Sequence, residues 1–381
     1  MTLTIHRLGT LLGQPLRQVW PALALHYAVQ AVSVTVLAVM CARADLSLAE
    51  VLGRYDGNWF AEIASHGYAQ DVVVDAEGRP APVSLAFFPL YPGLVAVFAT
   101  VGVPVLAAEL LVTLAAGGVA AWGLYVLGAD VGGRRTGILL AGLWAMAPGS
   151  VVLHMGYSEA LFVALAVWTL VALRGRQWLP AAGLTVLAGL TRSTAVALIA
   201  AVVVAAAVAV VRRRDGWRPV AAAGLAPLGL LAYLLYVGAR ADRLDGWFWL
   251  QNEAWYMGFD GGAFTWQRLT DAFGGDAALW ARLVAAVVVA AVLFLLWAFT
   301  VPGLGPAAHV YTTLIVATAL GTSAFWQSRP RFLLPAVVLG VPLALLLARL
   351  PTWLLPVLLL PATVAGAWFG GLLLTVVQTN P

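Results

Sequence analysis

A polar segment early in the chain, residues 54–62, carries an acid that could act as a general base. Trp59, Phe60 and Ile63 fall on one helical face, which predicts a short amphipathic helix lying on a membrane. Asp56 would stand at the N-terminus of that helix. A carboxylate in this position either takes a proton from a hydroxyl group or simply caps the helix by accepting its first backbone N–H groups.

A second acid, Glu159, follows Tyr157 and opens an apolar run. The dipole of a helix favours an acid in its first turn, so capping is the simple explanation for Glu159. An ionisable group near the membrane boundary also indicates a functional site. His66 follows the amphipathic helix and is expected to be structural or interfacial, with contact to a substrate as the alternative.

Three arginines, Arg192, Arg329 and Arg331, stand where the topology given below places the outer ends of helices. Arginine on the outer face runs against the usual inside bias, so each is expected to have a partner. A guanidinium fork matches a phosphate or a carboxylate, and a lipid headgroup is the alternative partner. With Asp56, these residues predict a carboxylate base and several phosphate binders around one outer-face site. Further ionisable groups expected at these ends are Glu62, Glu109 and His154.

Composition predicts the elements that must position these residues. Of the 381 residues, 62% are hydrophobic and 10% are charged, and the mean hydropathy is +0.92. A soluble domain carries about 25% charged residues, so this chain needs lipid as its solvent. The apolar runs are too long for barrel strands and must therefore be helices. We expect an all-α polytopic membrane protein with about 11 transmembrane helices, near residues 19–41, 104–128, 136–153, 158–173, 178–191, 194–211, 218–238, 278–300, 307–323, 332–348 and 351–376.

The charged residues and the single cysteine narrow the class of protein. All 21 basic residues are arginine, which indicates a GC-rich genome, and the net charge of +4 does not suggest a nucleic-acid partner. Cys41 alone excludes an internal disulfide and a cysteine-based zinc site. The run Val19–Cys41 exceeds the ~7–15 residues of a secretory signal core. We therefore expect a retained first helix with its N-terminus inside.

The apolar run Leu85–Val103 decides the topology. If it crossed the membrane, the arginine-containing segments 132–135 and 212–214 would lie outside, against the positive-inside rule. We expect it to lie along the surface or to re-enter, helped by the breakers Pro89 and Pro92. The inside loops then hold Asp130 and Asp215 as their only acids, with the arginines Arg7, Arg17, Arg134, Arg135, Arg174, Arg176, Arg212, Arg213, Arg214, Arg218 and Arg349.

This topology gives a single domain, residues 1–381, with two large outer loops. Residues 42–103 hold Asp56 and the interfacial helices, and residues 239–277 are rich in tryptophan, which settles at headgroup level. Inverted repeats are common among transporters, and none is apparent here. The charges also lie at helix ends, so a secondary transporter or lipid flippase is the less favoured alternative. A purely structural subunit would leave Asp56 and the outer arginines without a role.

The polar motifs, taken in order, resemble those of PIG-V-like mannosyltransferases of the GT-C superfamily. They include a first-loop motif around Asp56, a following Phe-Phe-Pro-Leu-Tyr-Pro, a segment similar to Tyr-Thr-Glu-Ser-Leu-Phe and a late one similar to Arg-Tyr-Leu-Leu-Pro. Ser158, Ala160 and Phe332 depart from that pattern, which leaves the acid and the arginines in place. The matching segments are residues 54–60, 63–64, 67–68, 87–92, 157–162, 190–193 and 331–335.

The resemblance implies an inverting glycosyltransferase that moves a sugar, mannose first of all, from a polyprenyl-phosphate donor to an acceptor hydroxyl on the non-cytoplasmic face. Asp56 matches the family's catalytic acid and would act as general base. Arginine would stabilise the charge of the leaving phosphate. The donor is a lipid-linked substrate, and neither a metal nor another cofactor is implied. The expected substrate-binding residues are Arg54, Asn58, His66, Tyr157, Glu159, Arg192, Arg329 and Arg331.

The resemblance leaves the substrates open. Arabinofuranose and glucose are the alternatives to mannose, and a glycolipid, a lipoglycan or a secreted protein would each present acceptor hydroxyls. Membrane lipids are expected partners, whereas the sequence indicates no oligomeric state. The expected location is the plasma membrane of a bacterium with a GC-rich genome, with the active site facing outside.

Overall fold

The computed structural model describes residues 16–381, which are almost entirely helix and loop. Within this range the extended pairings are isolated bridges, Val74 with Pro80 and Phe259 with Thr322. Helices are the expected solution for long apolar segments, because a helix satisfies its backbone hydrogen bonds internally. Arg7, one of the arginines expected inside, lies outside the described residues.

Five helical segments in the described part of the chain are long and apolar enough to cross a membrane. A sixth candidate is a helix pair bent by 76°, and the expected count of 11 therefore remains a prediction. The five are α2 (Leu16–Arg43), α6 (Val105–Gly132), α11 (Arg218–Leu225) with α12 (Leu228–Arg240), α15 (Leu279–Phe299), and α19 (Leu354–Gly371) with η5 (Leu372–Val377). The bent pair consists of η3 (Trp326–Ser328) with α17 (Arg329–Leu333), followed by η4 (Val337–Leu339) with α18 (Gly340–Leu347).

Several expected spans are helices shorter than the roughly 20 residues that a perpendicular crossing needs. The expected helix 136–153 is wrong in its second half, because the helix ends at Ala145 and Pro148 and Gly149 break the chain before a 3₁₀ turn. These shorter elements are α7 (Arg134–Ala145), η2 (Ser150–His154), α8 (Glu159–Arg174), α9 (Trp178–Gly189), α10 (Ala195–Val211) and α16 (Pro306–Gly321).

The helices pack in one bundle in which α6 contacts α7 and α8, α8 contacts α9, α10 contacts α16, and α19 contacts α2. Small residues allow the closest of these approaches. A Cβ added to Gly128 of α6 would lie 2.8 Å from the Cα of Gly137 in α7. The backbones of α6 and α7 are therefore in direct contact, which buries one face of each helix.

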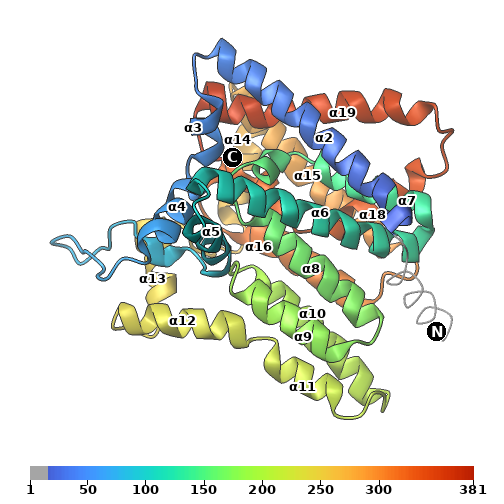
Figure 1. Ribbon diagram of the computed structural model, residues 1–381, viewed down its shortest axis with the longest axis horizontal. Helices are drawn as coiled ribbons and strands as arrows, with labels where there is room; N and C mark the ends of the chain where they lie inside the picture. The colour runs from blue at the N-terminus through green and yellow to red at the C-terminus, as the bar shows by residue number, and fades with distance from the viewer. Residues whose placement is uncertain (1–15) are drawn as a thin grey trace.

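Residues 42–103 form short helices at one end of the bundle, on the left in Figure 1. They are α3 (Leu48–Gly53), α4 (Asp56–His66), η1 (Ser84–Ala86) and α5 (Leu90–Thr100). An 11-residue helix such as α5 rises only about 16 Å, about half of the hydrocarbon core. This length fits the expectation that Leu85–Val103 does not cross the membrane.

The second expected loop forms α13 (Gly246–Ala254) and α14 (Ala263–Gly274), and aromatic contacts join it to the first loop. The ring of Trp59 lies 5.6 Å from those of Phe87 and Trp255 between centroids. Trp247 donates from its indole nitrogen to the Ala86 carbonyl at 3.2 Å. The two loops thus cover the same end of the bundle.

The two acids expected on the inner side are each paired with an expected inner arginine. Arg174 Nε donates to Asp130 at 2.8 Å, and Arg176 Nε donates to Asp215 at 2.7 Å. The turns between α6 and α7 and between α10 and α11 lie at the end opposite α3 and α4 in Figure 1. The bundle therefore separates the end with these two ion pairs from the end that carries Asp56.

Candidate active site

Asp56 is the first residue of α4, and a strained turn aims it. The preceding residue, Tyr55, has φ +61° and ψ −113°, a conformation that side chains with a Cβ rarely adopt. Such backbone strain collects at functional sites. No side-chain hydrogen bond caps α4, so the carboxylate of Asp56 is directed elsewhere.

Both oxygens of Asp56 are engaged by residues distant in sequence. Arg331 Nη1 donates to Asp56 Oδ2 at 2.6 Å, and Asn380 Nδ2 donates to Oδ1 at 3.3 Å. The hydroxyl of Tyr157 donates to Asn380 Oδ1 at 3.1 Å, which fixes the orientation of that amide. Ser328 donates to the Asn380 carbonyl at 3.1 Å. A capping role alone therefore does not describe Asp56.

Two arginines and two acids share this cluster. Glu159, the first residue of α8, lies 2.7 Å from Arg192 Nη1 and 3.7 Å from Arg331 Nε. Arg192 also donates to the Ser158 hydroxyl at 3.1 Å. The side chains of Glu159 and Arg331 are only 1% and 5% exposed. Such buried ions are stable only when paired, and here the four formal charges balance.

The cluster has unused hydrogen-bonding capacity. Both carboxylate oxygens of Glu159 and the Nε of Arg331 are buried without a well-aligned hydrogen bond among the described residues. Buried polar atoms normally find a partner, and exceptions call for an explanation such as a ligand. The cluster is thus suited to receive a polar group that donates to Glu159 and accepts from Arg331.

Arg331 is held in place by an unusual backbone path. Ala324 and Phe325, just before η3, both have positive φ values of 64° and 49°. Gly149, at φ +85°, packs directly against the backbone of Arg331. A Cβ added to Gly149 would lie 2.6 Å from the Arg331 backbone nitrogen. Only glycine fits this contact without displacing the arginine.

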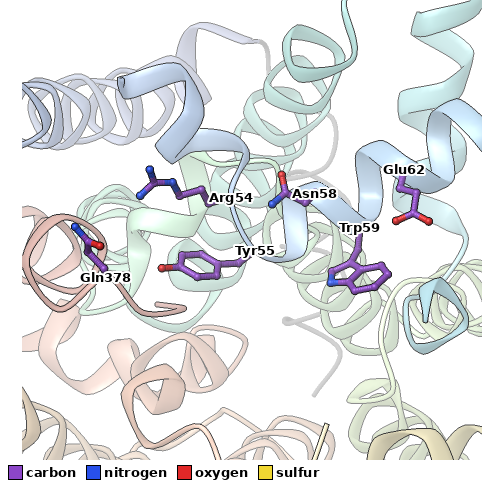
Figure 2. Close-up of a pocket in the computed structure, with 6 residues that line it drawn as sticks. All are labelled: Arg54, Tyr55, Asn58, Trp59, Glu62 and Gln378. Carbon is purple, nitrogen blue, oxygen red and sulfur yellow. The ribbon is translucent and has the colours of Figure 1, made fainter. Parts of the chain in front are cut away.

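A cavity of about 550 Å³ opens beside the cluster (Figure 2). It extends along α4, with the ring of Tyr55 pointing toward Gln378 in Figure 2. Burial raises the pKa of the Tyr55 phenol, and the charge of Arg54 partly opposes this shift. The phenol is therefore a neutral donor at physiological pH. The cavity is lined by Arg54, Tyr55, Asn58, Trp59, Glu62 and Gln378.

The structure brings together most, but not all, of the residues expected at the site. Asp56, Tyr157, Glu159, Arg192 and Arg331 form the cluster, and Arg54 and Asn58 line the adjoining cavity. Four other expected groups lie outside the cluster. Glu62 lines the cavity, His66 is exposed at the end of α4, His154 is buried against Gln30 at 2.7 Å, and Glu109 is buried under Gly156.

Arg329 is directed away from the cluster although it precedes Arg331 by two positions. Its guanidinium donates to the carbonyl of Ala319 at 2.6 Å and to that of Thr322, both at the end of α16. The side chain is fully buried and stands near the ring of Phe264. Arg329 therefore ties α17 to α16 and positions the segment that carries Arg331.

We expect Arg329→Met to lower stability far more than activity. Methionine keeps much of the volume but leaves the buried carbonyl of Ala319 and the partly buried carbonyl of Thr322 without this donor, at about 1–3 kcal/mol for the buried one. The Tm of the purified protein measures the first effect, and sugar transfer per folded molecule measures the second. An unchanged Tm with a large loss of transfer would show that Arg329 acts in the site.

Gly156 is a second glycine near the site at which an added side chain is expected to disturb the packing. Its added Cβ would lie 2.6 Å from Glu109 Oε2, so Gly156→Ala should displace the chain beneath Tyr157. Such overpacking typically costs about 1–3 kcal/mol. The double variant with Glu109→Ala removes the obstructing carboxylate and should recover most of the lost Tm. A double variant no more stable than Gly156→Ala would place the strain elsewhere.

Three residues of the site were not indicated by the sequence: Tyr55, Gln378 and Asn380. Asn380 follows η5 and lies 324 positions from Asp56. The only signal is a polar Gln-Thr-Asn after an apolar run, which is also common at a helix end. Within residues 16–381, no group of three or more His, Cys, Asp or Glu side chains could hold a metal ion.

The described residues form an all-α fold with five or six candidate membrane spans. Among the solved structures that it resembles are two of ArnT from Cupriavidus metallidurans, one bound to undecaprenyl phosphate and one in the apo state. Both align with a TM-score of 0.53 at 15% and 16% identity, over 92% of this chain and 76% of ArnT. No family model and no curated protein matches the sequence. The PIG-V-like resemblance of the motifs therefore remains a prediction.

Proposed function

We propose that this protein transfers a sugar from a polyprenyl-phosphate donor to an acceptor hydroxyl. The fold resembles that of ArnT, a GT-C polyprenyl-phosphate-sugar glycosyltransferase, of which one structure holds undecaprenyl phosphate. The observation that carries the proposal is the pairing of Asp56 with Arg331 beside a cavity of about 550 Å³. A carboxylate paired with an arginine next to a cavity offers the base and the phosphate-binding charge that an inverting transfer from a lipid phosphate needs.

In the proposed reaction, an oxygen of Asp56 takes the proton of the acceptor hydroxyl. The acceptor oxygen attacks the anomeric carbon while the bond from that carbon to the phosphate oxygen breaks on the opposite face. The electron pair of that bond stays with the polyprenyl phosphate, and the configuration of the sugar is inverted. No covalent glycosyl intermediate forms, so a single essential carboxylate suffices.

Arg331 and Arg192 are the proposed phosphate binders. Arg331 donates from Nη1 to Asp56 Oδ2 at 2.6 Å. A donor phosphate competes for this guanidinium, because arginine binds phosphate as well as carboxylate through two parallel hydrogen bonds. The exchange would place positive charge on the leaving group and free Asp56 to accept a proton.

The sugar pocket is proposed to lie between the cluster and the cavity. Tyr157 and Glu159 would contact the sugar from the side of α8, and Arg54 and Asn58 from the side of α4. His66 would reach the site only from the exposed end of α4. Mannose is the first candidate on the strength of the motifs. We further propose that the site faces the outside of a bacterial plasma membrane, as the arginine distribution predicts.

The test is a transfer assay with purified protein, a membrane lipid extract and a panel of radiolabelled polyprenyl-phosphate sugars. The panel contains mannose, glucose and arabinofuranose. Label that moves to a lipid from one donor supports the proposed function and names the sugar. Absence of transfer from the whole panel, with donor translocation across vesicles instead, would favour a flippase.

A further inference from the structure

A second cavity, of about 530 Å³, is an apolar groove between α2 and α19. It runs along α2 from Thr35 to Arg43 and along α19 from Pro361 to Trp368. Eight residues of helix rise about 12 Å, which gives the length of the groove. Pro361 interrupts the hydrogen bonding of α19, and the small Ala365 leaves depth beside it. The two helices pack against each other and leave a shallow groove along this stretch.

The groove faces the outside of the bundle. Val39, Val364 and Trp368 are 48%, 41% and 40% exposed. Both helices are candidate membrane spans, so these side chains meet lipid. A fatty chain is the occupant that matches an apolar furrow in this environment.

The groove ends at a cation. Arg43, the last residue of α2, lines it and is exposed. In the described part of the chain, no hydrogen bond or ion pair engages the Arg43 guanidinium. A lone arginine at the end of an apolar groove complements a lipid with a negatively charged headgroup.

The same two chain segments lead from the groove to the cavity beside Asp56. Beyond Arg43 the chain continues through α3 to Arg54, and beyond Trp368 it continues through η5 to Gln378. Arg54 and Gln378 both line the cavity (Figure 2). α2 and α19 both run toward this end of the bundle in Figure 1. A headgroup leaving the groove at Arg43 is thus directed toward the cavity.

We propose that the α2–α19 groove binds an anionic membrane lipid and that this lipid is the acceptor. The second part rests on the proposed function. The donor phosphate is assigned to Arg331 and Arg192 within the cluster, so the separate cation Arg43 serves a second anionic group. The headgroup of this second lipid carries the hydroxyl from which Asp56 takes the proton.

The first experiment measures lipid binding without any sugar donor. Purified protein is incubated with dioleoyl phosphatidylglycerol or dioleoyl phosphatidylcholine, and retained lipid is counted by native mass spectrometry. Arg43→Gln should lower phosphatidylglycerol retention about fivefold, as expected for one basic residue near an anionic lipid. It should leave phosphatidylcholine retention unchanged.

Two variants fill the groove from opposite walls, Val364→Trp and Val39→Trp. The matched control is Val292→Trp on α15, where valine is 39% exposed outside the groove. The groove variants should lose retention of both lipids, and the control should keep it. Equal retention by all three variants, with the elution profile of folded protein, would overturn the lipid site whatever the activity.

The second experiment assigns the lipid as acceptor. Under transfer conditions, Val364→Trp should raise the KM for the lipid acceptor and leave the KM for the donor unchanged. A raised donor KM instead would mean that the groove holds the polyprenyl chain, and would overturn the acceptor assignment. If wild-type protein transfers no sugar, the proposed function fails while the binding result stands by itself.

Discussion

Asp56→Asn is expected to abolish sugar transfer in protein that still folds. Asparagine keeps the shape and one hydrogen bond to Arg331, but its amide cannot accept the proton of an acceptor hydroxyl. A general base typically accelerates a reaction about 10²–10⁴-fold, so the rate of sugar transfer should fall by about that factor. The measurement is the rate of sugar transfer from the donor that the panel of polyprenyl-phosphate sugars identifies.

The matched control is Asp71→Asn, an exposed acid in the same loop. It should transfer at the wild-type rate. Donor binding by Asp56→Asn, measured separately with unlabelled polyprenyl phosphate, should be unchanged or tighter, because the variant competes less for Arg331. Undiminished transfer by Asp56→Asn would reduce Asp56 to a structural partner of Arg331.

Arg331→Gln is expected to reduce both activity and stability. The substitution leaves the half-buried Asp56 without its arginine and the buried Glu159 with Arg192 alone, at a cost of up to about 3–5 kcal/mol. Removing a group that stabilises developing charge also lowers the rate by about 10²–10³-fold. Thermal unfolding and the transfer assay measure the two effects independently.

Two companion variants separate these contributions of Arg331. Arg331→Lys keeps the charge but loses the planar fork, so it should regain most of the Tm and little of the rate. The double variant Asp56→Asn with Arg331→Gln removes both ions and should be more stable than Arg331→Gln alone. Full transfer activity of the Arg331→Gln variant would show that this arginine takes no part in the reaction.

The helical class and the position of Asp56 could be predicted from the sequence. Long apolar runs in lipid must form helices, because a helix satisfies its own backbone hydrogen bonds. The amphipathic pattern after Asp56 predicts the helix α4. The bends and breaks within the spans could not be predicted, because hydropathy does not report where a helix bends. The expected span 332–348 is part of a pair bent by 76°, and Pro227 separates α11 from α12.

The assembly of the site depends on tertiary contacts that local sequence does not encode. Arg329 and Arg331 have the same chemistry, yet residues two apart on a helix do not share a face. One reaches carbonyls of α16 and the other reaches Asp56. Asn380 joins the site only because α19 and η5 return the chain to α4, over a separation that no local pattern spans.

The bridge between Arg331 and Asp56 has a consequence for the order of events at the membrane. If an incoming lipid phosphate takes Arg331 from Asp56, the base becomes available only after the donor has bound. Donor would then have to enter before acceptor, and the spent carrier would have to leave before the next cycle. The same ion pair would form again once the spent carrier has left, so one contact would both stabilise the protein and order the steps of its cycle.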